Sequence, residues 1–216
     1  MNETFAPPNR NPALIGIGLG PGDPKLLTLA AVEALRDCDT VFVPGTLAAE
    51  LVAPYTDCEI LEFPMTKDLD VLNRHWQENA QKVGQAAQKG KTGFALIGDA
   101  NFFSTFTHLK QKVHQIYPDI EITTIPGVSS ITAFASKAGV ALENSFVVTD
   151  STPVSSKIIL KANRPAKMVA ELKSEGYTDF VFAERLFMDG EYVTNNTDEI
   201  PEKGNYFSIL YARKMI

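Results

Sequence analysis

The stretch LIGIGLGPGDPKLLTLAAVEAL, residues 14–35, places glycines at alternate positions directly after a short apolar run. Asp23 and Pro24 follow, and these residue types favour the N-cap and the first position of a helix. A glycine-rich turn between a strand and a helix lets the backbone approach a nucleotide closely. The same glycines also suit a tight turn with no ligand, so this stretch alone leaves both interpretations open.

Two common nucleotide motifs do not fit this sequence. In the dinucleotide pattern GxGxxG, counting from Gly16 puts Pro21 where the third glycine belongs. The second predicted strand ends in PG at residues 44–45, without the acid that would hold a ribose. The GKT at residues 90–92 resembles the end of a phosphate-binding loop, but Gln85 replaces its first glycine. A nicotinamide-dependent enzyme and a P-loop protein are therefore both disfavoured.

Composition indicates an ordinary globular protein. Of 216 residues, 44% are hydrophobic and 21% are charged, which suits one large domain or two small ones. The formal net charge is −6 and no segment gathers Lys and Arg, so nucleic acid is not an expected partner. No apolar run approaches the length of a membrane span, and residues 1–12 resemble a loose tail rather than a signal peptide.

Cysteine and histidine usage predicts no metal site. Cys38 and Cys58 form no CxxC motif, and the three histidines have no ligand-like spacing to them. We therefore expect reduced thiols and a cytoplasmic location.

The order of predicted elements divides the chain into two parts. Strand and helix alternate up to about residue 125, which predicts a parallel sheet covered by helices. The expected elements include a helix over residues 24–36 and a long helix that starts at Asp68. From residue 126 strand candidates crowd together, among them SFVVT at 145–149. We expect an N-terminal α/β domain over 1–125 and a C-terminal mixed-sheet α/β domain over 126–216.

Two later stretches repeat the pattern of the first loop. LIGDANFFSTF at residues 96–106 and TIPGVSSITAF at residues 124–134 each place glycine and small hydroxyl residues after a predicted strand. Open parallel sheets bind ligands at the carboxyl ends of their strands. The three loops are therefore expected to converge on one crevice.

In this order and spacing, the three stretches closely resemble the tetrapyrrole methylases, which transfer a methyl group from S-adenosylmethionine. LEFPMTKDLDVLNRHWQENA (61–80), KANRPAKMVAEL (161–172) and FAERLFMDGEYVT (182–194) are most similar to the precorrin-2 or cobalt-factor II C20-methyltransferases of cobalamin synthesis. The resemblance covers roughly residues 14–214. It implies a two-domain fold with the cofactor in the cleft between the domains, a tetrapyrrole substrate, S-adenosylhomocysteine as product, and a homodimer.

The resemblance also implies site residues. Those expected to bind the cofactor are Gly20, Pro21, Gly22, Gly98, Asp99, Phe102, Ser104, Thr105, Ser129, Ser130, Leu160 and Lys161. The substrate carries many carboxylates, and the cations expected to meet them are Lys67, Arg74, Arg164 and Arg185. For each of these cations a solvated surface charge is an equally open interpretation. No residue is singled out as a catalytic acid or base.

Two positions depart from the family pattern. Ala100 follows Gly-Asp where the family usually has proline, and residues 44–45 lack the acid of the uroporphyrinogen methylases. The second departure argues against the uroporphyrinogen reaction. The alternatives that remain are another methyltransferase of the family (uroporphyrinogen III, diphthine or ribosomal RNA) or a non-catalytic nucleotide-binding module. The sequence leaves open whether the substrate carries cobalt.

Overall fold

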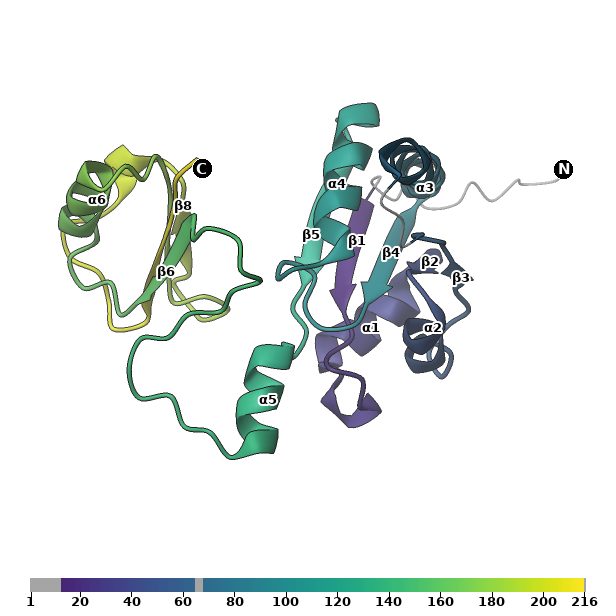
Figure 1. The fold of residues 1–216 in the computed structure, drawn as a ribbon, viewed down its shortest axis with the longest axis horizontal. Helices are drawn as coiled ribbons and strands as arrows, with labels where there is room; N and C mark the ends of the chain where they lie inside the picture. The colour runs from purple at the N-terminus through teal and green to yellow at the C-terminus, as the bar shows by residue number, and fades with distance from the viewer. Residues whose placement is uncertain (1–12, 65–67, 216) are drawn as a thin grey trace, which may run out of the picture. The chain divides into compact units, whose positions relative to one another are not determined.

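The computed structural model describes residues 13–64 and 68–215 (Figure 1). The chain forms two compact units, which divide between Leu142 and Glu143. This division falls later than the 125/126 domain boundary expected from the sequence, because the helix after the third loop belongs to the first unit. Among the described residues, no helix is both long and apolar enough to cross a membrane.

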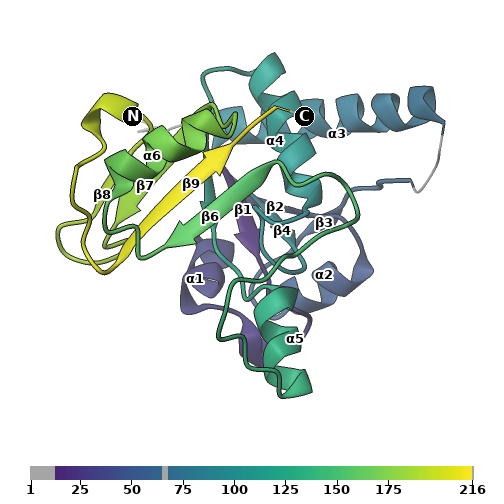
Figure 2. The same ribbon diagram turned by 60° about the vertical axis from the view of Figure 1, so that its left-hand side comes forward.

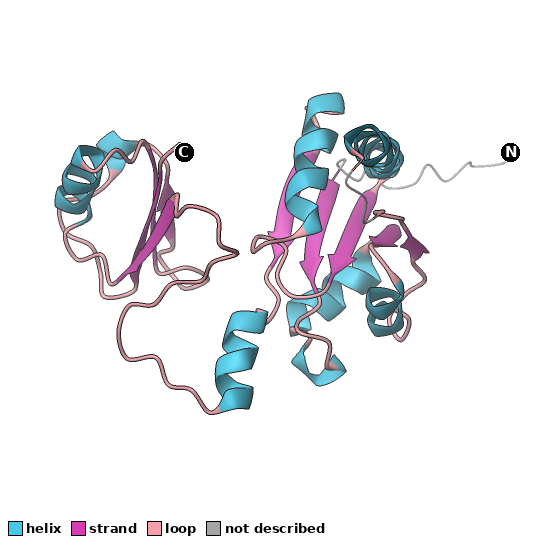
Figure 3. Ribbon diagram, viewed as in Figure 1, coloured by secondary structure: helices cyan, strands magenta, loops and turns pink. Residues whose placement is uncertain are grey.

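The first unit contains a five-stranded sheet in the order β3-β2-β4-β1-β5. Its strands are β1 (Ala13–Gly18), β2 (Thr40–Val43), β3 (Glu59–Ile60), β4 (Lys91–Leu96) and β5 (Glu121–Ile125). Every pair is parallel, so all carboxyl ends share one edge, and the arrows of β1, β4 and β5 point the same way in Figure 3. The predicted parallel sheet is confirmed.

Helices cover both faces of this sheet. On one face lie α1 (Leu29–Asp37) and α2 (Thr46–Val52), whose apolar side chains share a core with Ile17 and Val41. On the other lie α3 (Leu69–Lys89) and α4 (Thr105–Ile116), which pack on Leu14 and Phe94. Burial on both faces explains why the strands read as nearly continuous apolar runs. A further helix, α5 (Ser130–Ala138), follows the third loop and has no buried residue.

Local capping sets where these helices begin. Asp68 caps α3 as expected, since its Oδ1 accepts from the N–H groups of Asp70 and Val71. The helix expected over 24–36 is confirmed from Leu29 onward, but its expected start at Pro24 is wrong. Asp23 caps only the short 3₁₀ turn η1 (Pro24–Leu26), and the chain then extends at Thr28, whose hydroxyl accepts from Ala31 N–H and starts α1.

The second unit contains a four-stranded sheet in the order β6-β9-β7-β8. Its elements are β6 (Ser156–Leu160), α6 (Pro165–Ser174), β7 (Asp179–Glu184), β8 (Tyr192–Thr194), η2 (Thr197–Glu199) and β9 (Ser208–Arg213). All pairs are antiparallel, which corrects the expected mixed sheet. The crossover β6-α6-β7 would make a parallel pair, but β9 lies between the two strands and pairs with both (Figure 2).

The core of the second unit forms between α6 and one face of its sheet. Val169 and Leu172 of α6 pack in one cluster with Phe182 and Leu210, both fully buried. The expected strand over 145–149 is also wrong, because this segment runs as irregular chain with exposed side chains. The segment is rich in β-branched and aromatic residues, which favour strands, but it pairs with no strand of the first or second sheet.

Candidate functional site

The three motif loops follow neighbouring strands. Because β1 lies between β4 and β5, their loops leave the same edge of the sheet side by side. Gly20 and Gly98 form a backbone bridge: Gly98 N–H donates to Gly20 O at 2.7 Å, and Gly20 N–H donates to Gly98 O at 3.2 Å. The first two loops are thus joined main chain to main chain, as expected for converging loops.

Glycine is required where the three loops meet. A Cβ at Gly127 would lie 2.2 Å from Gly98 O and 2.7 Å from Gly18 C. A Cβ at Gly18 would lie 2.5 Å from Gly127 N. Real Cβ atoms do not approach backbone so closely, so this contact requires glycine at positions 18 and 127, while Gly98 contributes its carbonyl oxygen.

Asp99 fastens the second loop to the third. Its Oδ2 accepts from Gly127 N–H at 3.0 Å and its Oδ1 from Asn101 N–H at 2.8 Å, with the side chain 8% exposed. Asn101 adds a second tie, since its Nδ2 donates to Thr124 Oγ1 at 3.0 Å. The carboxylate therefore already holds the loops in position, and a cofactor contact at Asp99 stays a prediction.

Part of this edge is open backbone. Gly22 and Gly98 have φ of 119° and 81°, and a Cβ built at either would meet nothing within 4 Å. Left-handed backbone facing open space fits a ligand that approaches the main chain. These two positions therefore fit the nucleotide expected from the sequence, while Gly20 is confined by Leu26 O.

The hydroxyl residues near the loops have local roles. Ser104 is the N-cap residue of α4 and its Oγ donates to Ala100 O, while Thr105 is the first residue of that helix. Ser129 Oγ accepts from Ile131 N–H and caps α5, which begins at the exposed Ser130. Of these four residues, Ser129 is the one whose side-chain bond caps a helix, and the expected cofactor contacts of all four stay predictions.

Two neighbouring aromatic side chains of the second loop are exposed. Phe102, a predicted cofactor residue, is about half exposed, and Phe103 is more so. Phe103 also has φ of 49°, an uncommon backbone conformation for a non-glycine residue. The sequence analysis missed Phe103, although the adjacent pair of aromatic residues after Gly-Asp was a visible signal.

A groove of about 610 Å³ lies beside the first loop. Pro21 is the one predicted cofactor residue in its lining, which otherwise comprises Asp23, Leu26, Val128, Thr132, Ala133, Ser136 and Lys137. Its size is typical of small-molecule sites. The sequence analysis included Ser130 of α5 but missed the residues of that helix that line the groove, although Thr132, Ala133, Ser136 and Lys137 have the spacing of one helix face.

The predicted residues of the second unit gather near one end of its sheet. Leu160 ends β6, Lys161 follows it, and Arg185 directly follows β7. Arg164 occupies the N-cap position of α6 and is exposed. In the first unit Arg74 is exposed on α3, and Lys67 lies outside the described residues.

Within residues 13–64 and 68–215, no group of three or more His, Cys, Asp or Glu has an arrangement that could hold a metal ion.

Comparison with known proteins identifies the family. The model of the tetrapyrrole (corrin/porphyrin) methylases matches residues 13–200. A probable cobalt-precorrin-2 C(20)-methyltransferase from Methanocaldococcus jannaschii is 35% identical over 136 residues, which cover 59% of this chain and 57% of the relative. The precorrin-2 C(20)-methyltransferase of Sinorhizobium sp is 26% identical, covering 91% of this chain and 93% of that protein.

Solved structures agree on the fold. The cobalamin biosynthetic enzyme cobalt precorrin-4 methyltransferase, CbiF, superimposes with a TM-score of 0.52 at 20% identity, covering 97% of this chain and 98% of that chain. The family match spans both units, including the three glycine loops and most of the antiparallel sheet. The chain therefore belongs to the tetrapyrrole (corrin/porphyrin) methylases.

Proposed function

We propose that this chain transfers a methyl group from S-adenosylmethionine to C20 of precorrin-2, or of its cobalt form cobalt-factor II (cobalt-precorrin-2), during corrin-ring synthesis for cobalamin. The observation that carries the reaction class is the convergence of the three glycine loops at one edge of the parallel sheet. The names of the C20-methyltransferase relatives and the segments over 61–80, 161–172 and 182–194 support the choice of substrate.

The loops of the first unit fit a nucleotide-bearing methyl donor. Open left-handed backbone at Gly22 and Gly98 admits close approach, and the exposed Phe102 ring offers a flat apolar surface. We propose that these residues bind S-adenosylmethionine together with Gly20, Pro21, Asp99, Ser104, Thr105, Ser129, Ser130, Leu160 and Lys161. When bound, the donor supplies a methyl group on a positively charged sulfur.

The role of the chain in the reaction is positioning. The C20–methyl bond forms as the methyl–sulfur bond breaks, its electron pair stays on sulfur, and S-adenosylhomocysteine leaves. Aligning the two reactants and excluding water can contribute about 7–11 kcal/mol. A meso carbon of this tetrapyrrole is already electron-rich, so the methylating step needs no strong base, and the C20 proton is lost afterwards to solvent.

The carboxylates of the substrate require local positive charge on an acidic protein. The net charge is −6, and the cations we propose for this role are Lys67, Arg74, Arg164 and Arg185. The bidentate geometry of arginine suits carboxylates. We also propose a homodimer, which follows from the resemblance to the family; light scattering on the purified protein would measure its mass. We propose a cytoplasmic location on the same resemblance, and the free thiols of Cys38 and Cys58 agree with a reducing compartment.

Two alternatives remain. Family members named for methylation at C(11) and C(17) also match this chain, so another ring position is the first alternative. A module that binds the donor without turning it over is the second. The ribosomal RNA and diphthine methylases of the family fit less well, because the acidic charge disfavours RNA and the stretch after Leu61 is typical of the C20 group.

One anaerobic experiment separates these functions. The full chain is incubated with S-adenosylmethionine and either metal-free precorrin-2 or its cobalt form, and the product is weighed and its methyl group located by NMR. One added methyl at C20 of one substrate supports the proposal and selects the metal-free or the cobalt route. A methyl at another carbon favours the first alternative. Binding of S-adenosylhomocysteine with no transfer to either substrate overturns the C20 assignment.

A further inference from the structure

One end of the antiparallel sheet brings together side chains from two distant segments. Glu184 at the end of β7 pairs with Ser208 at the start of β9. Arg185, just beyond, donates its N–H to Phe207 O at 2.9 Å. The loop after β7 and the loop before β9 therefore lie side by side. We define Arg185, Phe187, Tyr206 and Phe207 as the strand-end cluster.

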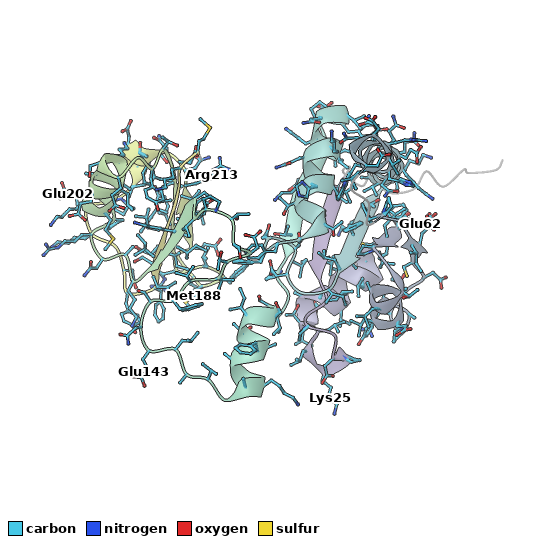
Figure 4. The ribbon with its side chains drawn as sticks, in the orientation of Figure 1. Lys25, Glu62, Glu143, Met188, Glu202 and Arg213 are labelled. Atoms are coloured by element: carbon cyan, nitrogen blue, oxygen red, sulfur yellow. The ribbon has the colours of Figure 1, made fainter. Side chains whose placement is uncertain are left out.

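The strand-end cluster exposes aromatic rings. Phe187 is 85% exposed, Tyr206 64% and Phe207 55%, and the last two rings meet edge to face at 5.3 Å between centroids. Lys161 Nζ lies 5.0 Å from the centre of the Tyr206 ring. Met188, labelled in Figure 4, is also exposed on this loop. Isolated exposed rings are ordinary on protein surfaces, but several on two adjoining loops indicate a binding surface.

The backbone of the strand-end cluster is unusual. Arg185 and Phe187 have φ of 55° and 61°, and Lys161 at the same end of the sheet has φ of 55°. Non-glycine residues in this region cost on the order of 1–3 kcal/mol each and concentrate at binding sites. The strained turn projects Phe187 into solvent instead of burying it, which has no benefit for the fold.

Arg185 has an unused hydrogen-bond donor. Its Nε is buried and has no partner among the described residues. Among the acids near it in sequence, Glu184 Oε2 accepts from Asn205 N–H at 2.8 Å and Glu191 Oε2 accepts from Phe187 N–H. A buried donor without a partner in a native structure calls for an explanation, and rotation of the guanidinium toward a bound carboxylate would supply one.

We propose that the strand-end cluster binds the tetrapyrrole itself, with Arg185 pairing with one of its carboxylates and the rings of Phe187, Tyr206 and Phe207 lying against the macrocycle. This inference rests on the proposed function. A flat conjugated ring edged with carboxylates presents apolar faces and negative charge together, which matches exposed aromatic rings beside a guanidinium. On a protein of charge −6, Arg185 then acts as a residue that selects polycarboxylate substrates.

Binding of uroporphyrin III, a stable polycarboxylate tetrapyrrole, to the full chain tests the inference. Fluorescence titration compares the wild type with Arg185→Gln, Arg185→Lys and Phe187→Ala. The matched control is Lys167→Gln, which also removes one positive charge from the second unit but lies on α6, where it pairs with Glu171. Circular dichroism establishes that each variant is folded, and calorimetry measures S-adenosylhomocysteine binding.

We expect Arg185→Gln to raise the Kd for uroporphyrin roughly tenfold or more, since a charge-assisted hydrogen bond is lost. Arg185→Lys keeps the positive charge but lacks the paired N–H donors of a guanidinium, so its Kd should increase less. Phe187→Ala should raise the Kd several-fold. Lys167→Gln should stay within about twofold of the wild type. Binding of S-adenosylhomocysteine should be unchanged in all four variants.

Each other outcome overturns the inference in a recognisable way. If Arg185→Gln and Lys167→Gln weaken binding equally, only overall charge matters and the strand-end cluster is not the site. If Arg185→Gln does not fold, Arg185→Lys and Phe187→Ala decide the test. Unchanged Kd values in both of these variants refute the inference. A wild type that methylates precorrin-2 but does not bind uroporphyrin refutes the inference alone. A wild type that neither binds nor methylates any tetrapyrrole refutes the proposed function as well.

Discussion

The two units build the edges that we propose as ligand sites from different parts of the chain. At the carboxyl edge of the parallel sheet, backbone meets backbone through Gly18, Gly98 and Gly127, and the buried Asp99 joins the loops. In the strand-end cluster of the antiparallel sheet, the side chains of Phe187, Tyr206 and Phe207 are exposed, and the backbone at Arg185 and Phe187 has positive φ. Changes at the first edge should therefore affect folding, and changes at the second should affect binding alone.

The largest expected effect tests the glycine contact. In Gly127→Ala the new Cβ would lie 2.2 Å from Gly98 O, so we expect the free energy of unfolding to fall by about 3 kcal/mol. Trp76, the one tryptophan, lies on α3 and reports the first unit in urea denaturation. The control is Gly45→Ala, where a Cβ meets nothing within 4 Å and the change should stay within about 0.5 kcal/mol. Equal stability of the two variants would contradict the packed-loop description.

The next effect tests the carboxylate that joins the loops. Asp99→Ala leaves the N–H groups of Gly127 and Asn101 without their acceptor, and we expect a loss of about 2 kcal/mol in the same assay. Asp23→Ala is the control, because Asp23 also accepts from the N–H two residues on but is exposed and joins no second loop. That control should cost about 0.5 kcal/mol. A similar loss in both variants would show that the bond to Gly127 contributes little.

A smaller effect is expected in the second unit. Phe187→Ala removes a ring that is almost fully exposed, so stability should change by less than about 0.5 kcal/mol, whereas we expect tetrapyrrole binding to weaken. Thermal unfolding followed by circular dichroism measures this. A loss of more than about 1 kcal/mol in the free energy of unfolding would mean that the Phe187 ring packs in the folded protein. Changes at the second edge would then affect folding as well as binding, contrary to the expected difference between the two edges.

A further small effect, this time on pH dependence, should distinguish the first unit from the second. Burial raises the pKa of the Cys38 thiol to about 11 from 9.0. The folded state therefore holds the thiol proton more tightly than the unfolded state does. The resulting contribution to the free energy of unfolding is complete below pH 9 and is lost as the pH rises toward 11. Because Cys38 is partly exposed, we expect the first unit to lose less than about 1 kcal/mol over this range. Both cysteines lie in the first unit, and Cys38→Ala should flatten the dependence reported by Trp76.

The first unit could be predicted from its sequence because its signals are local. Apolar runs alternate with amphipathic stretches, and the parallel sheet follows from that order. The three loops were placed together because parallel strands bring their carboxyl ends to one edge. The choice of strand neighbours was not visible, however, and it is the place of β1 between β4 and β5 that brings Gly18, Gly98 and Gly127 into contact.

The sequence-based predictions were wrong at two kinds of place: where strands far apart in the sequence pair, and where a second capping residue lies close to the expected one. The sheet of the second unit was expected to be mixed, but β9 enters between β6 and β7 from the end of the chain and makes every pair antiparallel. The helix expected over 24–36 breaks because the Thr28 hydroxyl supplies a better start at Leu29. Neither apolar periodicity nor residue propensity reports such choices.

By itself, the sequence determined the family, the parallel sheet and the residues of the three loops, because glycines, caps and apolar periods act over a few neighbouring residues. Only the tertiary structure decided what those residues touch. Asp99 accepts from a residue of another loop, and Arg185 meets Phe207 through strand register. Contacts between segments far apart in the chain depend on how strands order and pair, which no short stretch of sequence encodes.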